Sequence, residues 1–570
     1  MQIINKLDIN PCDSIIYLMG IPSYFSHIVK SHRKIIKKYK ANDCKIDNLY
    51  LDSNSIIYDV IREIEARQGN ETLIIKAVCE KIQQYIDIIS PKQRIFIAFD
   101  GVAPVAKLDQ QRTRRYKGDF QKNLVDELED IHVPQAANMP QAVNMPQKQP
   151  DKPPFDTVCI TPGTAFMSKL SDALEKRFNN KKKMKLSEVI VSTSAEPGEG
   201  EHKIYAYIRE HAEYHRHTAT AIYGLDADLI MLTLNHLHVA KEMYLFRETP
   251  HFIKSIDRSL DPNQNYVLDI PMLADELGTQ LNNNKRPSEE RKMRIIRDYI
   301  FICFMLGNDF MPHFPALNIR TIGIDLLLNA YNHVLGSIGK YLTSGVQSES
   351  EPEVKIVWGN LKKLVQHLAE NEHEYIKDEY RLRRKRRNGK NAYRASQTAD
   401  DIVTSLPLVD YYSEEYINPF EFGWQERYYS EVFDIDIDDE RKKAISINYL
   451  GGLEWTLAYY TTGCKNWRWT YKYHYPPLLS DLLRYIPFFD TEFVQDAAAN
   501  PVKSEVQLAY VLPKQKLGLL PQNIHQALLK EIPECYQDNL PMKYAFCRYL
   551  WEAHIDFPEI SISELERIVG

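Results

Sequence analysis

The fold of this chain is decided by residues 94–117, which read RIFIAFDGVAPVAKLDQQRTRRYK. The stretch begins with a short apolar run, typical of a strand inside a sheet, and this run ends in Asp100. A segment rich in Lys, Gln and Arg follows, where the spacing predicts a helix over 107–130. A strand, a carboxylate and a helix in this order are typical of α/β domains.

The same order recurs outward from this stretch in both directions. Further short apolar runs predict strands at 48–52, 188–193, 221–226 and 242–246. Amphipathic segments predict helices at 54–66, 71–89, 164–180, 201–213 and 289–306. We therefore expect an α/β fold over the first part of the chain, with a sheet flanked by helices.

The composition is that of a globular protein. The 570 residues are 44% hydrophobic and 26% charged, which excludes disordered, collagen-like and disulfide-framework proteins. The net charge is 71 − 77 = −6, so contact with a polyanion depends on local basic segments. The eight cysteines are scattered without metal-ligand spacing, and we interpret them as reduced thiols of an intracellular protein. The apolar runs fall short of the roughly 20 residues that span a bilayer, so we expect no membrane contact.

Breaks in composition divide the chain. Residues 1–18 precede a second methionine and are interpreted as an N-terminal extension. The α/β domain then covers 19–343, with a flexible linker insertion predicted at 131–154, where the near-repeat PQAANMPQAVNMPQ lies. After an acidic, serine-rich break, residues 354–570 indicate a mostly helical, aromatic-rich lobe.

Acidic residues follow the predicted strands at the end where open α/β sheets bind ligands. Taken singly, each has a simpler interpretation as a helix N-cap. Seven together indicate a metal site, because gathered carboxylates repel one another unless a cation neutralises them. The seven are Asp52, Asp100, Glu199, Glu201, Asp226, Asp228 and Asp309.

The kind of metal follows from the kind of ligand. Oxygen ligands without histidine or cysteine favour Mg²⁺, with Mn²⁺ as the alternative, over zinc. Two such ions would activate a water molecule and stabilise the leaving oxygen of a phosphodiester, which is the two-metal route of nucleases. In that route no side chain is required as the general base.

A basic stripe lies on the predicted helix that follows Asp100. Its residues are spaced i, i+4, i+7 and i+8, which places them along one helical face, and they are Lys107, Gln111, Arg114 and Arg115. A charge run is more often a solvated face, but an amide among cations on one stripe favours a shaped anion pocket. Arginine forks and a lysine point charge would prefer a terminal phosphate monoester to a diester.

Two further segments stand out. The basic run RLRRKRR at 381–387 lacks the stripe's spacing, so we interpret it as a solvated face, with nonspecific nucleic-acid contact and a nuclear address as alternatives in that order. The segment 449–482 is crowded with Trp and Tyr, most of which we assign to the core. Alternating aromatic and basic residues within it also suit stacking on bases.

Ordered motifs along the chain resemble those of the 5′ to 3′ exoribonuclease (XRN) family. The match runs from about residue 19 to about residue 525 and includes MGIPSYF, NLYLDSNSII, FIAFDGVAPVAKLDQQRTRRY, ITPGTAFM, PGEGEHKI, YGLDADLIML, FMLGNDFMPH and YHYPPLLSD. The resemblance implies a Rossmann-like mixed sheet of the PIN and flap-nuclease kind, with the helical lobe completing the active site. Family members continue into further domains, so we expect this chain to be a catalytic core alone.

The resemblance also implies an activity. Such enzymes remove nucleotides processively from single-stranded RNA that carries a 5′ monophosphate, depend on Mg²⁺ and release nucleoside 5′-monophosphates. By motif position, the seven carboxylates named above would bind the metal and the four residues of the stripe would bind the 5′ phosphate. Where the family has a base-stacking histidine this chain has Tyr58, and the candidates for the opposing ring are Trp467 and Trp469.

Two other functions stay open at this point. One is a structure-specific 5′ nuclease acting on DNA, and the other is a catalytically silent RNA-binding scaffold. Decapping or RNA-processing proteins are the expected partners. We expect a cytoplasmic location ahead of a nuclear one, for which RLRRKRR is the alternative signal.

Overall fold

A computed structural model of the chain describes most of its residues. The described ranges are 23–40, 45–65, 70–132, 155–179, 186–247, 260–261, 264–345, 354–390, 398–408, 410–434, 436–495, 500–538 and 540–570. The predicted extension 1–18 and nearly all of the predicted linker 131–154 lie outside them. Within these ranges, each helix is too short or too polar to cross a membrane.

A mixed seven-stranded sheet forms the centre of the first half, as predicted. Its strands lie side by side in the order β1-β7-β6-β5-β2-β3-β4. The five strands β2 to β6 run parallel to one another. β7 pairs antiparallel with β6, and β1 pairs antiparallel with β7. The strands are β1 (Ile36–Lys38), β2 (Asn48–Asp52), β3 (Arg94–Ala98), β4 (Glu188–Ser192), β5 (Ala219–Tyr223), β6 (Glu242–Arg247) and β7 (Tyr266–Asp269).

The order of these strands creates a switch point between β2 and β5. Strands β3 and β4 follow on one side of β2, and β5 and β6 lie on the other. Loops that leave neighbouring strands in opposite directions open a crevice at such a point, and ligands of open α/β sheets bind there. The loops after β2 and β5 carry predicted metal ligands.

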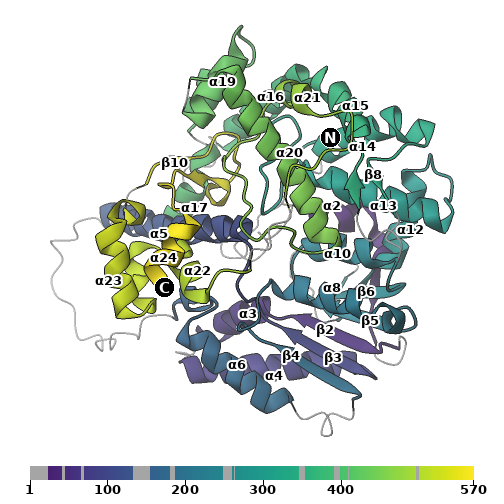
Figure 1. The fold of residues 1–570 in the computed structure, drawn as a ribbon, viewed down its shortest axis with the longest axis vertical. Coiled ribbons are helices and arrows are strands. Elements are labelled where there is room, and N and C mark those ends of the chain that lie inside the picture. Colours follow the sequence, from purple (N-terminus) through teal and green to yellow (C-terminus); the bar gives the residue numbers. More distant parts are fainter. Residues whose placement is uncertain are drawn as a thin grey trace, which may run out of the picture.

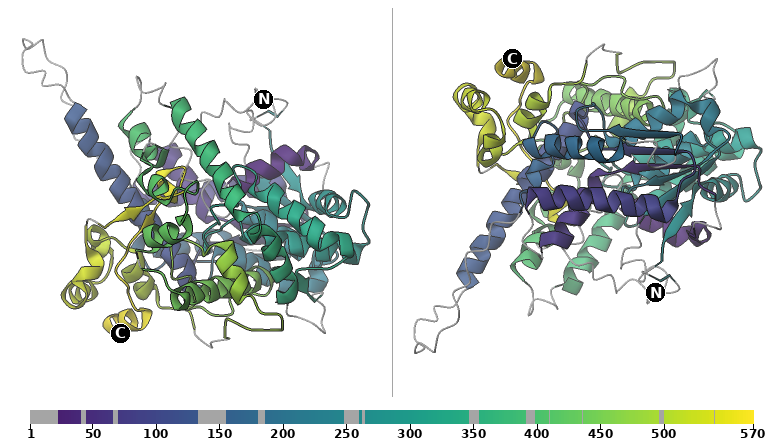
Figure 2. Two further views of the ribbon diagram at one scale, coloured as in Figure 1. Left: turned by 90° about the horizontal axis from the view of Figure 1, so that it is seen from above. Right: turned by 90° about the horizontal axis from the view of Figure 1, so that it is seen from below.

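Helices cover both faces of the sheet (Figures 1 and 2). Alternate residues of each strand point to opposite faces, so Tyr50 packs in one hydrophobic cluster while Leu49 and Leu51 pack in the other. One face is covered by α3 (Asn54–Glu65), α4 (Glu71–Ile89) and α6 (Ala165–Phe178). The other is covered by α2 (Tyr24–Ser31), α8 (Gly200–Glu210), α10 (Asp228–His236), α12 (Ile270–Gln280) and α13 (Glu289–Phe304). A single turn, α9 (Ala212–His215), follows α8.

The second half is mostly helical and shares the core of the first. One hydrophobic cluster continues from α10 and α13 into the helices that follow them in sequence. These are α14 (Gly323–Val334), α15 (Trp358–Ala369), α16 (Glu372–Lys390), α18 (Tyr412–Ile417), α19 (Trp424–Phe433), α20 (Asp439–Thr461) and α21 (Leu479–Tyr485). The short helix α17 (Ala399–Thr404) packs instead in a small separate cluster with α5 (Val105–His132). Two short antiparallel pairs complete the second half, β8 (Thr343–Ser344) with β9 (Lys355–Ile356) and β10 (Met542–Lys543) with β11 (His554–Ile555).

The long helix α5 (Val105–His132) connects the halves. Its first turns pack with a third cluster, which contains Leu108 and the helices α22 (Ser504–Val511), α23 (Gln522–Glu531) and α24 (Ile562–Val569). Its far end projects from the body of the molecule (Figure 2). The beginning of α5 therefore lies where the sheet and the C-terminal helices meet.

The structure corrects several predicted boundaries. The strands expected at 94–100 and 221–226 end at Ala98 and Tyr223, because the chain leaves the sheet before the acidic residues. The helix expected at 201–213 is split into α8 and α9, and α5 continues through 131–132, which had been assigned to the linker. The strands β1 and β7 were missed. β1 is an edge strand of three residues whose sequence, IKK, shows no apolar run, and β7, between β1 and β6, is only four residues long.

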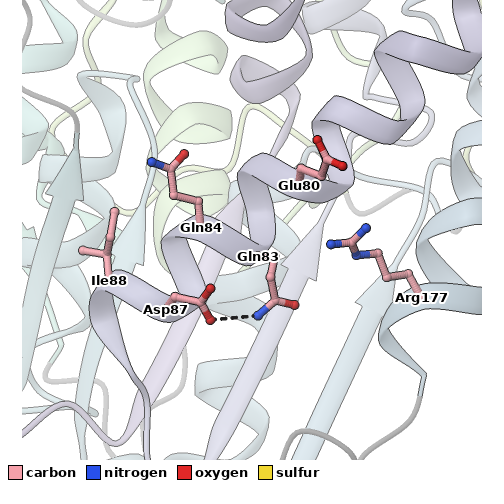
Figure 3. Close-up of a pocket in the computed structure, with 6 residues that line it drawn as sticks. All are labelled: Glu80, Gln83, Gln84, Asp87, Ile88 and Arg177. Atoms are coloured by element: carbon pink, nitrogen blue, oxygen red, sulfur yellow. Dashed lines mark hydrogen bonds between the residues drawn. The ribbon is translucent and has the colours of Figure 1, made fainter.

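One open cavity of about 450 Å³ lies on the outer side of α4 (Figure 3). It is lined by Glu80, Gln83, Gln84, Asp87, Ile88 and Arg177, and the Gln83 amide donates a hydrogen bond to Asp87. This cavity contains none of the predicted site residues. It is therefore separate from the candidate active site.

Candidate active site

The seven predicted carboxylates come from five separate segments of the chain. Asp52 is the last residue of β2, and Asp100 lies two residues after β3. The other five lie at the start of α8, between β5 and α10, and after α13, and they are Glu199, Glu201, Asp226, Asp228 and Asp309. The ends of parallel strands meet at one edge of the sheet, so these loops face a common space.

A glycine allows two of these loops to approach each other. The Gly200 amide donates a 2.7 Å hydrogen bond to Asp100 Oδ1. A Cβ atom at Gly200 would lie 2.7 Å from Asp52 Oδ1, so only glycine leaves room for both carboxylates. The Asn54 side chain also donates to Asp100 and accepts from its backbone amide at 3.1 Å. These hydrogen bonds fix Asp100, and Asp52 lies next to it across Gly200.

A buried lysine lies among the carboxylates. Lys107 Nζ is 2.6 Å from Glu199 Oε1 and 2.7 Å from Asp309 Oδ2, and the side chains of all three are less than a tenth exposed. Burial by itself would lower the pKa of Lys107, but Asp309 and Glu199 outweigh it, and the pKa is raised well above its usual range. Lys107 therefore carries a full positive charge as the counter-ion of two carboxylates.

One lysine does not neutralise this cluster. Burial raises the pKa of Asp52 well above its usual range, and the charges of Asp100 and Glu199 raise it further. The pKa of Glu201 is also raised well above its usual range, first by burial and then by Asp226 and Glu199. For Asp226, burial comes first, followed by Asp228 and Asp309, and the shift is again upward. The carboxylates thus lie within range of one another and lack positive charge.

The lack of positive charge among these carboxylates means that the residues of the site fit a divalent metal ion. Closely placed carboxylate oxygens, with raised pKa values, match the hard oxygen donors that Mg²⁺ and Mn²⁺ prefer. In the described part of the chain, no three His, Cys, Asp or Glu side chains lie close enough together to form an ion site by themselves. Like charges separate when no cation lies between them, and Lys107 holds Glu199 and Asp309 to itself.

The basic stripe on α5 is divided between two environments. Lys107, at one end, contacts carboxylates. Arg115, at the other end, donates from Nη2 to the Thr161 hydroxyl at 2.7 Å, and burial together with Arg114 lowers its pKa to about 10. Its Nη1 and the Gln111 Oε1 are buried, and neither has a hydrogen-bond partner among the described residues. That all four stripe residues bind one anion stays a prediction.

The three predicted stacking residues differ in their surroundings. Tyr58, on α3, is half-buried and close enough to Arg115 to influence its pKa. Trp469 is stacked on the buried Trp455, with ring centroids 5.1 Å apart. The carbonyl of Trp467 accepts a 3.0 Å hydrogen bond from Val105 at the start of α5. Trp467 thus lies next to the phosphate-binding helix, and its role as the opposing ring stays a prediction.

The sequence did not reveal that an aromatic column reaches the carboxylates. Trp455 stacks on Tyr459 with centroids 4.8 Å apart, and the Tyr459 hydroxyl donates to Glu199 Oε2 at 2.7 Å. The ring of His202 stacks on Tyr459 at 3.7 Å, and burial lowers the His202 pKa well below its usual range. Tyr459 lies in the Trp- and Tyr-rich segment 449–482, but its partner Glu199 is 260 residues away in sequence.

A second unpredicted contact joins α5 to the C-terminal part. Asp109, buried between the stripe residues, accepts hydrogen bonds from the hydroxyls of Thr470 and Tyr510. Thr470 belongs to the aromatic loop and Tyr510 to α22. Asp109 therefore fixes both segments against the face of α5 next to the predicted phosphate pocket.

Comparisons with known proteins cover nearly the whole chain. Residues 19–249 match the family model described as XRN 5′-3′ exonuclease N-terminus, and residues 291–415 and 410–568 match the Xrn1 helical domain. The chain is 27% identical to the 5′-3′ exoribonuclease 2 of Gallus gallus over 94% of its length, which covers 68% of that protein. It is 26% identical to the 5′-3′ exoribonuclease 1 of Saccharomyces cerevisiae and 28% identical to that of Homo sapiens, and covers 40% and 34% of them.

Proposed function

The chain belongs to the XRN 5′-3′ exonuclease family, and from this premise we propose that it degrades single-stranded RNA from a 5′ monophosphate end. One observation carries the proposal. The cluster of carboxylates that lacks positive charge and the buried guanidinium that lacks an anion are joined by the first three turns of one helix, α5. A divalent cation and a phosphorylated RNA end would supply the two missing charges.

The carboxylates would hold the metal. We propose Mg²⁺, with Mn²⁺ as a substitute, and two ions held by the seven carboxylates named above. When bound, such ions lower the pKa of a water molecule and stabilise the leaving oxygen of a phosphodiester. The products would be nucleoside 5′-monophosphates. The protein's own contribution is to position Asp52 and Asp100 through Gly200 and Asn54, and to orient Glu199 through the Tyr459 hydroxyl.

The other end of the stripe would hold the 5′ phosphate. Arg115 offers a buried Nη1 donor, Gln111 would donate from its Nε2, and Arg114 adds charge on the same face. A phosphate monoester brings more charge to a buried guanidinium than a diester does. We propose that Tyr58 and Trp467 hold the terminal base by stacking, which is tolerant of base identity. An enclosed pocket of this kind would not admit a cap or a triphosphate.

The cellular setting is also a proposal. An enzyme that requires a 5′ monophosphate depends on a preceding reaction that exposes it, so decapping or RNA-processing proteins are the partners we propose. We propose an intracellular site of action, in the cytoplasm ahead of the nucleus.

A time course on four substrates tests the function. One 3′-labelled RNA is prepared with a 5′ monophosphate, a 5′ triphosphate or a 5′ hydroxyl, together with a DNA of the same sequence, and each is incubated with Mg²⁺. We expect rapid loss of the monophosphate RNA without ladder intermediates. Asp226→Asn should slow it by a factor on the order of 10³, because it removes one carboxylate from the metal site.

Each other outcome identifies an alternative. Equal cleavage of all three RNA ends, or internal cuts, would contradict the phosphate pocket. Preference for the DNA would favour a structure-specific DNA nuclease. Binding without cleavage in Mg²⁺ and in Mn²⁺ would favour a silent RNA-binding scaffold.

A further inference from the structure

A short loop between α18 and α19 presents aromatic side chains to solvent. Phe422 is fully exposed and Phe420 is 41% exposed. Tyr412 and Tyr416 of α18, which precede the loop, are exposed as well. Large apolar side chains in contact with water are unfavourable for the isolated protein, and a group of them marks an interaction surface.

The loop is held rigidly by one arginine. Arg427, on α19, donates to the carbonyls of Tyr416 and Ile417 at 2.9 and 3.1 Å. It also donates to those of Asn418 and Phe422 at 3.1 and 2.8 Å. His373 adds a 2.7 Å hydrogen bond to the Pro419 carbonyl. The exposed rings are therefore pre-organised, which lowers the entropy that a ligand must overcome on binding.

The basic run RLRRKRR lies against this loop. The guanidinium groups of Arg381 and Arg384, both exposed on α16, lie 5.7 and 5.2 Å from the centroid of the Phe420 ring. Arg381 also pairs with Asp378 at 2.5 Å. In sequence, residues 381–390 carry seven Lys or Arg and no acidic residue. Arg383 is buried and paired with Glu414, so the positive charge described next to the exposed rings comes from Arg381 and Arg384.

The exposed phenylalanine rings and the arginines beside them together indicate the class of ligand. Sites for single-stranded nucleic acid combine aromatic side chains that stack on bases with basic side chains that contact the backbone. A protein partner would account for the rings, whereas the exposed cations Arg381 and Arg384 next to Phe420 also match the phosphates of a nucleic acid. We propose that Phe420, Phe422, Arg381 and Arg384 form a second RNA-binding site, which engages single-stranded RNA outside the active site.

The site's position gives it a role. α16 and α19 lie at one end of the long axis of the molecule, and β3 and β4 lie at the other (Figure 1). We assign to this site a part of the strand that lies further toward its 3′ end than the nucleotide at the carboxylates. This role rests on the proposed function, whereas the binding itself does not.

Binding is therefore measured separately from hydrolysis. The probe is a 3′-fluorescein RNA of 30 nucleotides with a 5′ hydroxyl, in EDTA, so that neither the 5′ phosphate nor the metal contributes. We expect Phe420→Ala with Phe422→Ala to weaken binding about tenfold, as the loss of base stacking predicts. The matched control is Phe488→Ala with Phe489→Ala, which removes two phenylalanines of 77% and 72% exposure from the loop after α21. The control should bind as the unmodified protein does.

The arginines give a second readout. Arg381→Ala with Arg384→Ala should flatten the dependence of log K on log[salt] by about 0.7 per lost phosphate contact.

Unchanged binding by the phenylalanine variant, or equal loss in the control, would overturn the proposal, and unchanged binding would favour a protein partner for the loop. Hydrolysis of a 5′-monophosphorylated RNA dinucleotide, which offers the active site one phosphodiester and leaves no further strand, should be the same in all variants. Failure of the unmodified protein in that assay would overturn the proposed function and leave the binding result standing.

Discussion

The first three turns of α5 hold two buried cations in opposite circumstances. Lys107 contacts two carboxylates, and its pKa is raised. Arg115 contacts a neutral hydroxyl, and its pKa is lowered to about 10, chiefly by burial. Both belong to one stripe in the sequence, spaced by eight residues. Only their partners, which come from other parts of the chain, make them different.

The difference separates a counter-ion from a binding site. A buried charge that is paired stabilises the structure around it, and removal of one partner leaves the other charge uncompensated. A buried charge without a partner is costly, and the cost is recovered when an anion binds. On this account, Lys107 stabilises the metal-free protein. The charge of Arg115 is compensated only when the 5′ phosphate of the RNA binds.

The largest effect should come from removing Lys107, the cation that is paired with two carboxylates. Lys107→Met leaves Glu199 and Asp309 without their counter-ion, so the free energy of unfolding in EDTA should fall by about 3–5 kcal/mol. Urea denaturation followed by circular dichroism measures this. Added Mn²⁺ should recover most of the loss by replacing the ammonium. Lys76→Met, on the exposed side of α4, is the control and should change stability by less than about 0.5 kcal/mol. Equal stability of Lys107→Met and the control in EDTA would contradict the counter-ion role.

Substitution of Arg115, the cation that contacts no carboxylate, should change the activity rather than the stability of the protein. Arg115→Met should lower kcat/KM on the 5′-monophosphate RNA about 10²-fold, because a charge-assisted contact to phosphate is lost. On the 5′-hydroxyl RNA it should change little. Its free energy of unfolding should be equal or higher, since an unpaired buried charge is removed. Arg216→Met, at an exposed position, is the matched control. A large loss of stability in Arg115→Met would show that Arg115, like Lys107, is a structural cation.

The carboxylates were predictable from sequence for a physical reason. An inner strand is a short apolar run, and the first polar residue after it, as in NLYLD or IFIAFD, lies at the edge of the sheet. β2, β3 and β5 were found in this way. β1 was missed because an edge strand is partly exposed and IKK carries no apolar run, and β7 was missed because YVLD is only four residues long.

The contacts of the site could not be predicted in the same way. Helical spacing places Lys107 and Arg115 on one face but does not say which loops face them. The hydroxyl of Tyr459 reaches Glu199 across 260 residues of sequence, and Tyr510 reaches Asp109 across 401. Such pairs depend on how the two halves pack. The sequence predicted which residue types gather. Only the structure shows which of their charges have a counter-charge and which do not.

The cost of an unpaired buried charge also predicts a pH dependence. His215 is buried, with one ring nitrogen 2.7 Å from the Tyr50 hydroxyl and the other 2.9 Å from the His211 carbonyl, which suits the neutral ring. Burial lowers its pKa from 6.5 to about 4. The unfolded chain then binds this proton more readily, so stability is present above pH 6.5 and is lost as the pH falls toward 4.

The matched variant isolates this contribution. From pH 7 to pH 5, His215 should account for a loss of about 2 kcal/mol in the free energy of unfolding. His215→Gln, which cannot be protonated, should therefore have a shallower pH dependence than the unmodified protein, whatever its stability at pH 7. His217→Gln, at an exposed position, should keep the original slope. Parallel curves for all three proteins would contradict the assignment.

The smallest effect should come from the hydroxyl that holds Arg115. Thr161→Val removes the acceptor of the Arg115 Nη2 bond at nearly constant volume. The guanidinium then loses its orientation but keeps its charge, so kcat/KM on the 5′-monophosphate RNA should fall only about 3- to 10-fold. The ratio of rates on monophosphate and hydroxyl ends should fall by the same factor. Thr161→Ser should restore it, and an equal loss on both ends would mean that Thr161 acts only on the fold.

The most direct test of the account is a crystal structure of the Asp226→Asn variant with Mn²⁺ and a 5′-monophosphorylated trinucleotide. The account predicts anomalous density for Mn²⁺ among the strand-end carboxylates and the 5′ phosphate within hydrogen-bond distance of Arg115 Nη1 and Gln111. A 5′ phosphate bound elsewhere, with Arg115 still buried against Thr161 alone, would contradict it.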